Sequence, residues 1–179
     1  FQSLYRPIKE FLFSAEFAAR ARLTPAAFTR QRELPLPHRV GLLLNRRKGS
    51  LQEEVNGFWA VLTGQPLATG VSAAALCKAR QKLDPYALWT LNERLLGAFA
   101  QAVPLRRWHG LRVLATEGST LRLPPTPAVI AHFGAPPAGS TIPLGRLSQR
   151  VDVLDGVAVE AELDAYDVGE RVLASEHLE

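Results

Sequence analysis

The sequence contains one cysteine, Cys77, and no methionine among its 179 residues. A single thiol excludes an internal disulfide, and we expect a reducing compartment. The chain has no uninterrupted apolar run of about 18 residues and no signal-peptide pattern, so nothing predicts a membrane span or secretion. Because the chain begins at Phe1 and lacks methionine, we expect a fragment or a processed chain rather than a whole gene product.

Motifs for common cofactor sites are also missing. The four histidines, at positions 38, 109, 132 and 177, lack the spacing of zinc ligands, which argues against a structural zinc site. The glycine-rich stretch "GQPLATG" lacks the lysine of a phosphate-binding P-loop. There are no internal repeats and no low-complexity segments.

Charge is unevenly distributed along the chain. The net charge is +4, but residues 1–110 carry 16 basic and 7 acidic side chains, whereas residues 111–179 carry 5 and 10. The first part is therefore at +9 and the second at −5. Such an asymmetry favours contact between the first part and a polyanion such as nucleic acid, with a merely solvated basic surface as the alternative.

Up to about Ala102, apolar residues recur at helical spacing. Thr24-Pro25 has the pattern of an N-cap followed by proline at the first helical position, and Ser50 with Glu53 forms a capping box. The pattern predicts helices near residues 1–12, 14–23, 24–31, 38–45, 50–62, 73–83 and 85–102.

Residues 73–83 have the pattern of a recognition helix in a helix-turn-helix-like arrangement with 50–62. On a helical wheel, Leu76, Ala79 and Leu83 lie on one side and Lys78 and Gln81 on the other. We expect Lys78 and Gln81 to reach base edges, the flanking cations to meet phosphates, and the N-cap to leave N–H groups near a phosphate. A surface helix with solvated lysines is the alternative. The predicted DNA-binding residues of this helix are Ser72, Lys78, Arg80, Gln81 and Lys82.

A second basic group is the turn "NRRKGS". Its cations Arg46, Arg47 and Lys48 either contact phosphate or simply stabilise the C-terminus of the preceding helix.

After Pro104 the pattern changes to strands. Residues 111–116 are expected to form a central strand that ends at Glu117, and 147–153 and 157–163 a hairpin around "LDG". If Val151 and Val153 share one face of the hairpin with Val157 and Val159, Val153 lies opposite Val157 and Gly156 has a positive φ. Arg150 then faces Glu160, and Asp152 lies at the surface. A last helix begins at Gly169-Glu170.

Glu117 is the candidate catalytic residue and metal ligand. A carboxylate at the C-terminal end of a central strand is where open sheets place chemistry, and with further acids it could hold Mg²⁺. The structural alternative is that it accepts N–H bonds or pairs with an arginine such as Arg122.

An ordered set of motifs resembles the front portion of DDE transposases of the insertion-sequence-four type. The motifs are "RQRELPLPHRVGLLLNRRKGSLQEEVNGFW", "VSAAALCKARQKLDPYAL", "TEGSTLRLP", "FGAP" and "GRLSQRVDVLDGV…VGERVLASEHL". The resemblance extends from about Phe28 to the end. It implies a helical DNA-binding region and a ribonuclease-H-like catalytic domain whose three acids bind two metal ions, Mg²⁺ or Mn²⁺.

The resemblance also implies a defect in catalysis. The family's first acid is an aspartate before Gly-Ser/Thr, and Glu117 stands at that position with a side chain one methylene longer. The other two acids would lie beyond Glu179. Because the chain then has one ligand position of three, and a 1 Å error in placing that ligand can lower a rate roughly 10²-fold, we expect it to cut no DNA.

We therefore predict an α+β protein with a helical DNA-binding domain at 1–104 and the first strands of a ribonuclease-H-like mixed sheet at 105–179. The expected function is that of a transposase or transposase fragment on double-stranded transposon ends. A non-enzymatic DNA-binding or regulatory remnant is the first alternative, and a module whose basic helices bind protein is the second. We expect a cytoplasmic, nucleoid-associated bacterial protein, for which a homodimer on DNA is one arrangement.

Overall fold

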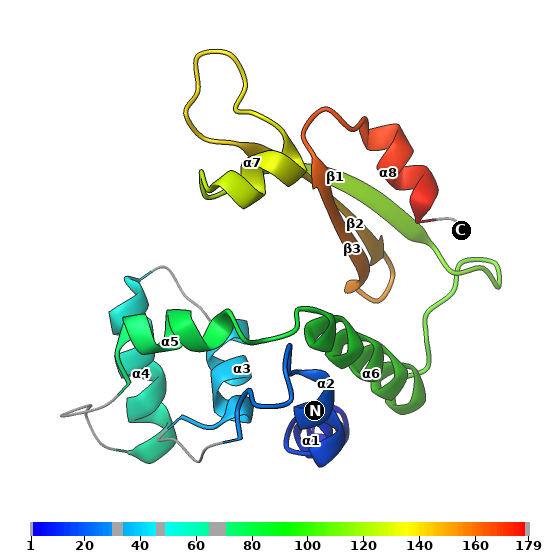
Figure 1. Cartoon of the computed structure of the whole chain (residues 1–179). Helices are drawn as coiled ribbons and strands as arrows, with labels where there is room; N and C mark the ends of the chain where they lie inside the picture. Colours follow the sequence, from blue (N-terminus) through cyan, green and yellow to red (C-terminus); the bar gives the residue numbers. More distant parts are fainter. Residues whose placement is uncertain (1, 30–33, 46–48, 65–70, 178–179) are drawn as a thin grey trace. The chain divides into compact units, whose positions relative to one another are not determined.

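The computed structural model describes residues 2–29, 34–45, 49–64 and 71–177. The chain has an α+β architecture, with helices followed by a three-stranded antiparallel sheet, and divides into two compact units, Phe1–Ala102 and Val103–Glu179 (Figure 1). No helix in the described ranges is both long enough and apolar enough to cross a membrane.

The first unit is built from six described helices. Their bounds are α1 (Gln2–Leu12), α2 (Ala15–Arg20), α3 (Leu36–Leu44), α4 (Leu51–Thr63), α5 (Ala73–Arg80) and α6 (Tyr86–Ala102). The predicted helix at 24–31 is wrong for its described part, since residues 25–28 form turns and Phe28 has a φ of 58°. A left-handed residue there stops helix propagation despite the favourable Thr24-Pro25 start.

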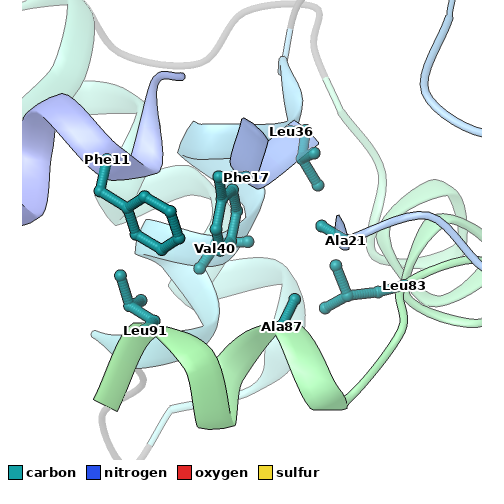
Figure 2. Close-up of a cluster of buried hydrophobic side chains, with 8 residues drawn as sticks. All are labelled: Phe11, Phe17, Ala21, Leu36, Val40, Leu83, Ala87 and Leu91. Carbon is teal, nitrogen blue, oxygen red and sulfur yellow. The ribbon is translucent and has the colours of Figure 1, made fainter. Parts of the chain in front are cut away.

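An apolar core joins α1, α2, α3 and α6 (Figure 2). Phe17 is fully buried and packs edge-on against Phe11, with ring centroids 5.4 Å apart. The cluster as a whole consists of Phe11, Phe17, Ala21, Leu36, Val40, Leu83, Ala87 and Leu91. Burial of this apolar surface is the main term that stabilises the helical unit.

A smaller apolar cluster positions α4 and α5. It contains Leu34, Leu42, Val55 and Leu76. The predicted capping box of α4 is confirmed, because the Ser50 hydroxyl accepts from the Glu53 N–H and the Glu53 carboxylate accepts from the Ser50 N–H. Leu76 thus packs α5 against α3 and α4 and fixes which face of α5 is turned outward.

The second unit contains β1 (Leu114–Arg122), β2 (Leu144–Asp152), β3 (Val157–Ala165), α7 (Pro127–Phe133) and α8 (Glu170–Glu176). The strand order is β1-β2-β3. The prediction of a central strand ending at Glu117 is wrong: β1 is an edge strand of this sheet, and it continues five residues beyond that position. The start of the last helix is confirmed, with Gly169 as its N-cap.

The predicted hairpin register is wrong, although Gly156 has the expected positive φ of 67°. Val157 lies opposite Asp152, which leaves a four-residue turn at 153–156. Arg150 lies opposite Glu160 as predicted, but the register shifts between Arg150 and Val151, so one extra residue sits in β3. The shift is a β-bulge, which the alternation of valines does not reveal.

Asp152 is buried, not at the surface as predicted. Its Oδ1 accepts the N–H groups of Leu154 and Asp155 at 3.1 and 3.2 Å, and its Oδ2 accepts from Arg112 Nε at 2.6 Å. The Arg112 hydrogen bond, together with the two backbone donors, holds the pKa of Asp152 below its ordinary value. Asp152 therefore organises the turn between β2 and β3.

The two faces of the sheet differ in character. Directly opposed residues share a face, so Gly118, Ser148 and Glu162 form one row and Thr116, Arg150 and Glu160 the next. Helix α8 covers this polar face. Within residues 103–177, all of which are described, the buried polar side chains are Ser148, Asp152 and His177, and Leu173 is the one large apolar core residue apart from Pro143.

We predict that Phe17→Ala lowers the free energy of unfolding of the helical unit by about 3–5 kcal/mol, because it leaves a cavity in the apolar core. Phe13→Ala is the control, since the Phe13 side chain is 51% exposed. It makes an edge-to-face ring contact with His38. Phe13→Ala should lower stability by about 1 kcal/mol or less. Urea unfolding followed by circular dichroism measures both, and equal losses would contradict the assigned core.

We predict that Asp152→Asn destabilises the sheet unit by about 1–3 kcal/mol at neutral pH, because the charge-assisted bond to Arg112 is lost. The folded pKa of Asp152 is lowered, so its stabilisation is present above the unfolded pKa of about 3.9 and is lost as pH falls through the folded pKa. The difference between wild type and variant should therefore shrink in acid.

The matched control for this variant is Asp167→Asn, which changes an exposed carboxylate of the same unit. Urea unfolding between about pH 2 and 7 checks the pair across the unfolded pKa. A pH-independent difference, or an equal effect of the two substitutions, would contradict the role assigned to Asp152.

Candidate functional site

Helix α5 turns its cations outward. Lys78, Arg80, Gln81 and Lys82 are exposed, whereas Leu76 and Leu83 are buried, as the helical wheel predicts. Ala79 is half-buried rather than buried, so the outward face is wider than predicted. The helix ends at Arg80, earlier than expected, and Gln81 is its C-cap. A small, uncrowded first turn is thus followed by a cluster of long polar side chains.

The N-terminus of α5 is fastened to α4. The Ala73 N–H donates to Gln52 Oε1 at 2.8 Å, and the Ala75 N–H donates to the Ser72 hydroxyl at 3.1 Å. These two N–H groups are consequently used inside the protein and are not available to a phosphate. Contact with nucleic acid would rest on the exposed side chains of α5 rather than on its helix dipole. The second predicted basic group, Arg46, Arg47 and Lys48, lies outside the described residues.

Glu117 lies on the sheet face opposite α8. Its directly opposed residue is Gln149, followed in the same row by Ala161. The side chain is exposed, and among the described residues it belongs to no group of three side chains that could hold a metal ion. Arg122, the alternative partner, lies five residues further along the strand and therefore on the other face.

A different set of side chains meets beneath α8. The His177 ring is fully buried at the end of this helix, with Nε2 2.9 Å from Ser148 Oγ on β2 and Nδ1 3.1 Å from Glu160 Oε2 on β3. Arg150 pairs with Glu160 at 2.8 Å and also donates to the His177 carbonyl. One imidazole therefore links the helix to two strands.

Glu160, Glu162 and His177 form a group that could hold a metal ion, with one ligand atom of each lying within 4.8 Å of the others. Burial raises the pKa of Glu162, and its hydrogen bond with Glu176 and the charges of Glu176 and Glu160 raise it further, while His177 acts in the opposite direction. Histidine spacing could not reveal this group, since two members are glutamates and the three come from separate elements. The i, i+2 spacing of Glu160 and Glu162 on a strand is the signal that was available.

The Ser148–His177–Glu160 arrangement has the order of a nucleophile, a base and an orienting carboxylate. Ser148 and His177 are, however, only 2% and 3% exposed. A groove of about 410 Å³ does exist in the described part of the chain, but it lies between α1 and α6 and contains none of these residues. The arrangement is therefore suited to holding α8 on the sheet rather than to attacking a substrate.

Further polar contacts lie at the start of α8 and at the hairpin between β2 and β3. Arg146 binds Glu170 at 2.7 Å and the Tyr166 carbonyl at 3.1 Å, which fixes the start of α8. A side chain at Gly118 would meet this pair, because a Cβ there would lie 2.9 Å from Glu170 Cδ. At the hairpin, Arg106 binds Asp155 at 3.1 Å.

Comparison of the chain with protein-family models, with curated proteins and with solved structures finds no match.

Proposed function

We propose that this chain is a DNA-binding protein of transposase type, whose helical unit binds duplex DNA and which does not itself cut DNA. The observation that carries the proposal is the outer face of α5. Leu76 anchors the helix, and Lys78, Arg80, Gln81 and Lys82 are exposed on a part of the chain with a charge of +9. Lys78 and Arg80 on the helix and Lys82 just beyond its end can neutralise phosphates, and Lys78 and Gln81 can donate to base edges.

The way α5 is held supports a recognition role. Its first turn carries only alanines, of which Ala74 and Ala75 are exposed, so another molecule can approach the backbone closely. Gln52 holds the start of α5 against α4, and Leu76 holds its middle. A helix fixed at both points presents its side chains with little loss of conformational freedom on binding.

We assign the second unit to a ribonuclease-H-like sheet because of the motif resemblance and the order of the strands and helix in this unit. Three antiparallel strands in the order β1-β2-β3, followed by a helix, are compatible with the opening part of such a sheet. In this proposal Glu117 occupies the position of the first catalytic acid. Among the described residues it belongs to no group of three possible metal ligands, and the proposed absence of cleavage by this chain is in line with that.

A mobility-shift assay with duplex DNA tests binding. We expect binding at about 50 mM salt and a steep fall in affinity as salt rises, because bound phosphates release counterions. Lys78→Ala should lose about 1–3 kcal/mol of binding free energy on a site selected from a random library, and less on random duplex. Arg80→Ala should weaken both alike, as a phosphate contact does.

The matched control is Lys9→Ala, which removes the same charge from an exposed position on α1. We expect it to leave affinity nearly unchanged. No binding by the wild type at low salt, or equal losses for Lys78→Ala and Lys9→Ala, would contradict a DNA-binding face on α5.

Incubation of the chain with duplex DNA and Mg²⁺ or Mn²⁺ tests the absence of cleavage. We expect no strand cutting, and Glu117→Asp should not create it, since a single carboxylate leaves most of the coordination shell of Mg²⁺ to be filled. Metal-dependent cutting that disappears in Glu117→Ala would overturn this part of the proposal.

A further inference from the structure

The polar face beneath α8 gathers more negative than positive charge. Glu162 interacts with both Glu160 and Glu176 there, and Arg150 pairs with Glu160. The three carboxyl groups outnumber the one arginine that pairs with them, and the hydrogen bond between Glu162 and Glu176 requires a shared proton. Two of the carboxylates are half-buried, where an excess of like charge is unfavourable.

We propose that Glu160, Glu162 and His177 bind a divalent transition-metal ion of the Zn²⁺ class, which fastens α8 to β3. A divalent ion balances the excess charge on this face. One imidazole with two carboxylates suits Zn²⁺ or its neighbours, whereas Mg²⁺ prefers a shell made of oxygen alone. The site is on the opposite face of the sheet from Glu117 and is independent of the DNA-binding proposal.

The surrounding groups provide the support that metal ligands require. Ser148 Oγ, 2.9 Å from His177 Nε2, can accept the proton on that nitrogen and so direct the lone pair of Nδ1 toward the carboxylates. The contacts of Glu160 with Arg150 and His177 both use Oε2. Oε1 can therefore bind the metal while Oε2 keeps its bond to Arg150.

The geometry needs only a small adjustment. Ligand atoms around tetrahedral Zn²⁺ lie about 3.4 Å apart, as follows from bond lengths of about 2.0–2.2 Å. The three ligand atoms here lie within 4.8 Å of one another, so the long glutamate side chains must close by roughly 1–2 Å. Water can complete the shell, because both glutamates are only half-buried.

Titration of the metal-free full chain with Co²⁺, followed by NMR of the histidine rings, tests the site in the wild-type protein. We expect the His177 resonances to shift and broaden first, while those of His38, His109 and His132 stay in place. Zn²⁺ should compete for the same site and should raise the thermal unfolding temperature, and Mg²⁺ at equal concentration should do neither. No preferential effect on His177 would overturn the proposal.

Variants then identify the ligands through Zn²⁺ affinity, measured by competition with a chromophoric chelator. His177→Gln and Glu162→Gln should each weaken binding by about 100-fold or more, and Ser148→Ala, which removes a supporting contact, by about 10-fold. His132→Gln, at an exposed histidine outside the group, is the control and should leave the affinity unchanged. If His177→Gln and Glu162→Gln bind Zn²⁺ as tightly as the control, the site does not exist.

Discussion

The sheet unit depends on the pairing of polar groups that are buried on one face of the sheet. Ser148, Asp152 and His177 lie in its interior, and Leu173 is the large apolar side chain that joins them from α8. A buried carboxylate or imidazole without a partner is strongly destabilising, so Arg112 at the hairpin and Glu160 beneath α8 must be in place for the unit to close. The network is not fully satisfied, since Arg146 Nε and Arg150 Nε are buried without a hydrogen-bond partner, but its ion pairs and the Ser148–His177 contact join α8 to both strands.

The helical unit is stabilised differently, by apolar clusters rather than by buried polar pairs. Its two core clusters are apolar, and the cations of α5 lie exposed outside them. In the sheet unit several acids are used in internal ion pairs, among them Asp152, Asp155, Glu160 and Glu170. Several acids of the sheet unit therefore have a structural role, while the cations of α5 lie exposed.

Features set by a few neighbouring residues could be predicted from the sequence. The Ser50–Glu53 capping box, the inward position of Leu76 and the start of α8 each follow from spacing along one element. The edge position of β1 and the burial of Asp152 could not be predicted, because a bulge in β3 and an arginine 40 residues away determine the hairpin. The sequence analysis predicts no helix at α7, although Thr126-Pro127 and Gly134 mark its ends, because the surrounding prolines and glycines favour a loop.

The two candidate sites also differ in how far they could be predicted from residues within one element. The outward face of α5 is a helical-wheel property, whereas the group beneath α8 brings together a strand pair and a residue at the end of a helix. A double-mutant cycle of Glu160→Gln and His177→Gln, measured by urea unfolding with a metal chelator present, tests whether α8 is held by this network. The network predicts a coupling energy of about 1 kcal/mol or more between the two positions. A coupling near zero, with the two losses simply additive, would contradict it.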